Sequence, residues 1–127
     1  MAEGLSAYTA NAVLNAAGNN TSFAVAQAYV QLHVGAPGSA GTANPATETT
    51  RKAVSFAAAS AGSIASDADV SWTSISGSQD ATHFTVWDAL SLGNFLWSGT
   101  ITANGYIAGD TYVFPSGAFT ASFTLAS

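Results

Sequence analysis

The chain has 127 residues, which accommodates one hydrophobic core and predicts a single domain over residues 1–127. Only 7% of the residues are charged, and the two basic side chains exclude nucleic acids and anionic membranes as partners, because both need clusters of Lys and Arg. The chain has no cysteine, which excludes disulfides, thiolate metal sites and thiol nucleophiles.

Residues 5–17 predict the one helix of the chain. Ser6 is a typical N-cap residue, and Gly18 with the two asparagines after it is a typical C-terminal stop. Apolar residues recur at spacings of three and four: Leu5, Tyr8, Ala12 and Ala16. This apolar stripe is thin, so we expect the helix to lie on its own sheet or on a neighbouring subunit.

Beyond residue 23 the apolar period changes to two, which is typical of strands with one buried face. The strand-like segments are 28–34, 51–57, 68–72, 82–87, 95–101, 111–114 and 119–125. Residues 35–50 hold almost no large apolar side chain and predict a long loop, of the kind that is usually functional or mobile. Short strands separated by Gly, Pro, Asn and Asp predict a mainly β fold, an antiparallel β-sandwich or jelly-roll-like domain with a short N-terminal helix.

The sequence offers no residues that we would assign to catalysis, to a metal or to a cofactor. His33 and His83 fall on alternating strands, and their spacing brings no third ligand to them, so we expect satisfied or solvent-facing histidines. No Gly-x-Ser-x-Gly elbow is present, and the two glutamates lie in the N-terminal tail and the long loop. We therefore expect a protein that is not an enzyme.

Five residues are candidates for contacts with a partner. Leu5 and Tyr8 belong to the apolar face of the predicted helix. Trp87 is out of phase with Phe84 and Val86, so it faces the other side of its strand and is a better interface candidate than Trp72, which shares the phase of Val70 and belongs to the core. The other two candidates are the only cations, Arg51 and Lys52. They either protect a sheet edge or form an ion pair with another subunit.

The composition favours a surface that neighbours cover. Hydrophobic residues make up 48% of the chain, many of them alanine, and Ser, Thr, Gly and Asn supply most of the polarity. Isolated soluble domains usually carry many surface charges of both signs. The alternative is an exposed β domain with a neutral polar coat. No signal peptide and no run of about 20 apolar residues is visible, so we expect synthesis and assembly in a cytoplasm.

Several segments, in their order along the chain, resemble a known family. A Leu-Ser-x-Tyr helix start is followed by Phe-x-x-Trp-Asp-Ala at 84–89 and by Ala-Gly-Asp-x-x-x-Phe-Pro-x-Gly at 108–117. These segments are similar to small virion proteins of tailed bacteriophages, particularly those of actinobacterial hosts, which are commonly labelled tail-fibre, minor structural or capsid decoration proteins. The resemblance spans nearly the whole chain and brings no catalytic residues with it.

The resemblance and the composition together predict a virion structural protein. The first expectation is a capsid decoration, or minor capsid, protein that binds the major capsid protein and stabilises the head. The alternatives are a tail-fibre or tail-tip component that contacts the host surface, and a carbohydrate-binding β module. The expected partners are the major capsid protein or tail proteins, and further copies of the chain in a homo-oligomer such as a trimer.

Overall fold

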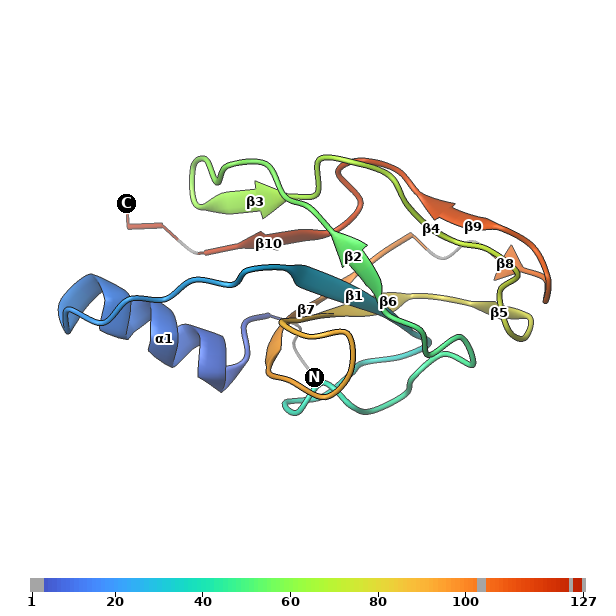
Figure 1. The fold of residues 1–127 in the computed structure, drawn as a ribbon, viewed down its shortest axis with the longest axis horizontal. Coiled ribbons are helices and arrows are strands. Elements are labelled where there is room, and N and C mark those ends of the chain that lie inside the picture. Colours follow the sequence, from blue (N-terminus) through green and yellow to red (C-terminus); the bar gives the residue numbers. More distant parts are fainter. Residues whose placement is uncertain (1–3, 103–104, 124, 127) are drawn as a thin grey trace.

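The computed structural model describes residues 4–102, 105–123 and 125–126, and its strands are short and antiparallel (Figure 1). The elements follow one another as α1 (Ala7–Gly18), β1 (Ala28–His33), β2 (Lys52–Val54), β3 (Ser63–Ala65), β4 (Val70–Trp72), β5 (Gln79–Asp80), β6 (His83–Trp87), β7 (Phe95–Thr100), β8 (Gly105–Tyr106), β9 (Tyr112–Phe114) and β10 (Thr120–Ser122). The predicted class, a mainly β antiparallel sandwich with a short N-terminal helix, is confirmed.

The first layer is a four-stranded antiparallel sheet in the order β2-β1-β6-β7. Val30 of β1 lies opposite Val86 of β6, and Leu32 lies opposite Phe84. All four of these side chains are fully buried. The period-two pattern of the sequence therefore sets one face of this sheet against the second layer.

The second layer is a long ribbon, formed by residues 63–80 running antiparallel to residues 105–122. Three two-stranded pairs lie along it in turn: β3 with β10, β4 with β9, and β5 with β8. Backbone hydrogen bonds at Ser66 and Ile75 continue the ribbon between the pairs. In Figure 1 the ribbon crosses above the sheet.

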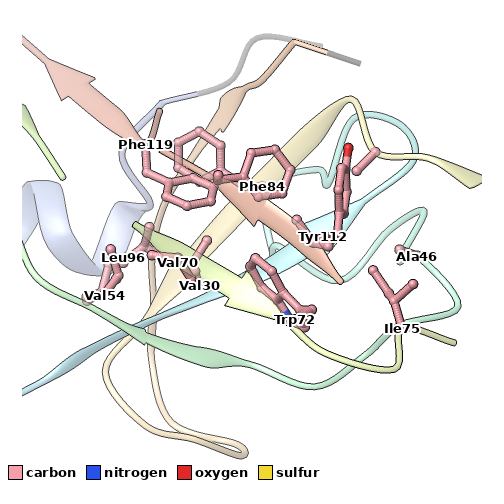
Figure 2. Packing of buried hydrophobic residues seen from close by; sticks show 14 residues of the cluster. Val30, Ala46, Val54, Val70, Trp72, Ile75, Phe84, Leu96, Tyr112 and Phe119 are labelled. Carbon is pink, nitrogen blue, oxygen red and sulfur yellow. The ribbon is translucent and has the colours of Figure 1, made fainter. Parts of the chain in front are cut away.

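Aromatic side chains fill the space between the two layers (Figure 2). The rings of Phe84 and Phe119 pack edge to face with centroids 5.0 Å apart, and Phe114 lies 5.3 Å from Phe119. Trp72 is 1% exposed, which confirms its predicted place in the core. A Cβ atom at Gly99 would lie 2.7 Å from the ring of Phe84, so this close approach requires glycine.

The helix begins at Ala7 and ends at Gly18, close to the predicted 5–17, and Ser6 is its N-cap because the Ser6 hydroxyl accepts a hydrogen bond from the Thr9 N–H at 3.1 Å. The predicted apolar face is covered only in part within the chain. Leu5 is half-buried and Thr9 is the buried residue of the helix, whereas Tyr8 is 45% exposed with its ring 6.2 Å from that of Phe23. The helix extends beyond the end of the sheet, so the sheet does not cover the whole of the predicted face (Figure 1).

The long loop at 35–50 is packed against the sheet rather than free of it. Ala46 is 2% exposed, and its N–H donates to the Leu32 carbonyl at 3.1 Å. Gly41 approaches Phe95 so closely that an added Cβ would lie 2.6 Å from the ring. The segment forms no helix or strand, but it covers one margin of the core.

The last predicted strand is shorter than its sequence pattern indicates. Phe119 is fully buried, but β10 ends at Ser122, and Phe123 and Leu125 are 53% and 57% exposed. The reason is that the partner strand β3 begins only at Ser63, after the turn at Gly62, so β10 has no strand residue to pair with beyond Ser122. The short strands β3 and β5 have no apolar alternation and were not predicted.

We expect Phe119→Ala to lower the free energy of unfolding by about 3–5 kcal/mol, because it removes the ring that joins the two layers and leaves a cavity. Phe123→Ala is the matched control. Phe123 lies four residues further along and is 53% exposed, so its loss should cost less than about 1 kcal/mol. Urea unfolding measures both. Similar losses in the two variants would contradict this packing.

Candidate interaction surface

Two of the predicted interface residues, Arg51 and Trp87, contact each other within the chain. The Arg51 guanidinium lies 4.0 Å from the centroid of the Trp87 ring. Trp87 is 7% exposed, its ring packs 5.4 Å from that of Phe95, and its N–H donates to the Thr85 hydroxyl at 2.7 Å. Trp87 does face away from the ribbon, as predicted, but it is already covered, and the expected accessible aromatic is not present at this position.

Arg51 holds the loop between β6 and β7. Its Nη1 donates to the carbonyls of Ala89 and Leu92 at 2.9 and 2.7 Å, and its Nε donates to the Gln31 side chain at 3.1 Å. These bonds use the Nε and Nη1 donors of Arg51 within its own chain, and the intersubunit ion pair stays a prediction. Lys52 is half-buried on β2, an edge strand of the sheet, which agrees with a role in protecting that edge.

Residues 88–94 form what we call the contact loop. Asp88 closes its base, because its two carboxylate oxygens accept hydrogen bonds from the backbone and side-chain N–H groups of Asn94 at 2.7 and 2.9 Å. Burial would raise the pKa of Asp88, but these bonds and the nearby Arg51 outweigh it and hold the pKa below its ordinary value. At the tip, Leu90 and Leu92 are 60% and 84% exposed. The loop is thus a fixed support for two exposed apolar side chains.

The histidines lie opposite each other, which their spacing did not reveal: His33 of β1 is paired with His83 of β6. His33 is fully buried; its Nδ1 donates to the Ala43 carbonyl at 2.8 Å, and its Nε2 accepts from the Thr85 hydroxyl at 2.9 Å. Burial lowers the pKa of His33, so the neutral ring is favoured. Its prediction as a satisfied histidine is confirmed. Within the described residues, no group of three His, Cys, Asp or Glu side chains could hold a metal ion.

A groove with an apolar lining lies between the helix and the ribbon. We call it the apolar groove; its volume is about 250 Å³. Its lining is contributed by α1, β3, β7, β10 and the segments beside them: Leu5, Thr9, Val13, Phe23, Ala59, Gly62, Ser63, Ile64, Trp97, Ala121, Ser122 and Phe123. None of these side chains is ionisable. Of the predicted contacts, Leu5 lies in the groove and Tyr8 lies on the helix outside its lining.

Trp97, which lines the apolar groove, carries an unusual polar atom. Its Nε1 is buried and, among the residues that the structure describes, is the one buried side-chain nitrogen or oxygen without a hydrogen-bond partner. An unpaired buried donor costs about 1–3 kcal/mol. One lining side chain, Phe123, is itself 53% exposed. This combination is typical of a surface that a protein partner covers.

Sequence reasoning missed the apolar groove because no local pattern marks it. Its lining comes from within residues 5–13, 59–64 and 121–123 and from residues 23 and 97, which meet only in the folded chain. The exposed Phe123 was the one available signal, and it was assigned to a buried strand face.

Glu48 ties the long loop to the ribbon. Its carboxylate accepts hydrogen bonds from the N–H groups of Ser76 at 2.9 Å and Thr50 at 3.3 Å, and the residue is 7% exposed. Burial would raise the pKa of Glu48, but the hydrogen bonds outweigh it and hold the pKa below its ordinary value. The carboxylate therefore stabilises the fold above its unfolded pKa, and this contribution is lost as the pH falls through the lower folded value.

We expect Glu48→Gln to lower the free energy of unfolding by about 1–2 kcal/mol at neutral pH, because a charged acceptor is replaced by a neutral one. The difference from the unchanged chain should shrink below about pH 4, where the carboxylate itself is protonated. Urea unfolding across a pH series measures this, with the exposed neighbour in Thr49→Ala as control. A constant difference at all pH values would contradict the assignment.

We expect Arg51→Lys to loosen the contact loop, because an ammonium group cannot reproduce the planar contact with Trp87 and the two carbonyl bonds together. Amide hydrogen exchange in residues 88–94 should accelerate at least severalfold, while exchange in β1 stays unchanged. Lys52→Arg is the matched control, since it alters the adjacent cation and should leave the loop protected. Equal exchange in both variants would show that Arg51 does not hold the loop.

In the part of the chain that the structure describes, no helix is long and apolar enough to cross a membrane. No curated protein matches the chain. A family model described as podophage GP4 fiber I protein gp80 matches residues 4–122, which is nearly the whole chain. The match supports the predicted resemblance to phage virion proteins, although it does not point to actinobacterial hosts. The chain belongs to this family of podophage fibre proteins and is a structural protein of the virion.

Proposed function

We propose that the chain is a non-catalytic component of a tail fibre, attached to other virion proteins through the apolar groove. The family match carries the first half of this proposal, because the family is described as a fibre protein. The groove carries the second half. It opens to the surface and none of its lining side chains is ionisable, so covering it with a partner removes apolar surface from water.

The capsid decoration role that we first expected has less support than the fibre role. The helix and Trp87 were its expected contact elements, and Trp87 is buried beneath Arg51. The family description names a fibre and not a head protein. Binding to the major capsid protein therefore remains the alternative, and the position of the protein on the particle distinguishes the two.

A carbohydrate-binding role has no stacking platform to support it among the described residues. Sugar rings need exposed aromatic faces, but Trp72 is 1% exposed and Trp87 7%, and Trp97 is partly buried against Phe56 at 5.2 Å. The described aromatic side chains that are clearly exposed are Tyr8 and Phe123. They support contacts with protein more readily than a row that binds glycans.

The position on the particle is tested by gold-labelled antibody against the chain in purified virions. We expect label at the tail and few copies per particle by quantitative gel analysis. Label distributed over the head, in copy numbers comparable with the major capsid protein, would overturn the fibre role in favour of capsid decoration.

Attachment through the groove is tested by incorporation into particles. We expect Phe123→Glu to reduce the amount of the protein in purified virions at least tenfold, because it places a charge on the apolar lining. Ile107→Glu is the matched control, since Ile107 is 67% exposed and lies outside the groove. Normal incorporation of the Phe123 variant would show that the groove is not the site of attachment.

A further inference from the structure

We propose that copies of the chain associate head to tail, with the contact loop of one copy seated in the apolar groove of the next. This inference rests on the proposed function, since it names the partner of the same groove. It is carried by two apolar surfaces of one chain: a loop that exposes Leu90 and Leu92, and a groove without ionisable lining residues.

The contact loop is built to present its leucines in one conformation. Leu92 is 84% exposed and has a backbone φ of +57°, a left-handed conformation that a leucine seldom adopts. The Leu92 carbonyl is bound by Arg51, and Asp88 closes the base of the loop. One of only two cations in the chain thus fixes the tip of a loop whose side chains face water. Such preorganisation lowers the ordering cost of binding.

The apolar groove has the features that this projection needs. Its volume of about 250 Å³ suits a few aliphatic side chains, and none of its lining residues is ionisable. The exposed leucine side chains of the contact loop suit such a lining, because both surfaces lose contact with water when they meet.

The two surfaces lie on opposite faces of the four-stranded sheet, so they meet only between copies. Trp97 is paired with Val86, whose side chain faces the ribbon, and this places the groove on the ribbon side. Arg51 and Trp87 support the contact loop on the other face. Figure 1 shows the loop between β6 and β7 on the side of β7 away from β10. A contact between unlike surfaces is heterologous, and it closes into a ring or continues as a filament.

The purified full-length chain should therefore self-associate in a concentration-dependent manner by sedimentation velocity. We expect Leu92→Asp and Phe123→Glu each to abolish association, because one removes the projection and the other the hollow. Both residues are mostly exposed, so folding should be retained, and urea unfolding checks this. Ile107→Asp is the control: it removes another exposed apolar side chain and should associate like the unchanged chain.

Mixing the two defective variants separates this contact from a symmetric one. The Leu92 variant keeps a working groove, and the Phe123 variant keeps a working loop. A mixture should form one-to-one heterodimers and nothing larger. The chain has no cysteine, so a second mixture of Leu92→Cys and Phe123→Cys should form a disulfide between unlike copies under mild oxidation.

A chain that stays monomeric at all concentrations overturns the inference, and so does association that Leu92→Asp leaves intact. Failure of the mixture to form heterodimers, when the unchanged chain associates, also overturns it. If the chain is monomeric while Phe123→Glu is still lost from virions, a different virion protein occupies the groove. The proposed function would then stand without head-to-tail association.

Discussion

The fold depends on the packing of the long ribbon against the sheet, and one aromatic contact lies at its centre. Phe84 lies on β6, an inner strand of the sheet, and Phe119 lies on the ribbon. Their ring centroids are 5.0 Å apart. The ribbon has only short, interrupted pairs of strands and would be marginal by itself. Burial of Phe119 and its neighbours on the sheet supplies the stability that the ribbon's own hydrogen bonds do not.

The sequence predicted the parts of the fold that are encoded by neighbouring residues. Alternating large apolar side chains marked β1, β4 and β6, and Ser6 marked the start of the helix. The short strands β3 and β5 were not predicted because their serine, alanine and glutamine residues show no alternation of large apolar side chains. They are strands only because the returning half of the ribbon pairs with them. Trp87 was predicted only in part for the same reason. Alternation predicted which face of the sheet it lies on, but its burial depends on Arg51, which is distant in sequence.

Scarcity of charge gives each ionised side chain a larger structural role. Arg51, Glu48 and Asp88 all bind backbone groups of loops, where no strand or helix partner is available. Each replaces hydrogen bonds that a regular element would have made. The loops of this chain are therefore fixed by its few ions, which leaves the remaining surface to alanine, serine, threonine and exposed leucine. That surface loses little hydration when another protein covers it.

Two local costs in the monomer point to the same conclusion about assembly. Trp97, whose side-chain donor is buried and unpaired, lines the apolar groove, and the left-handed Leu92 lies at the tip of the contact loop. Glycine suits a positive φ better than leucine does, so backbone preference alone does not account for leucine at position 92. Departures from local rules occur mainly at functional sites, where a gain elsewhere offsets them. In the head-to-tail contact that we propose, the gain is the burial of Leu92 in the apolar groove of a second copy.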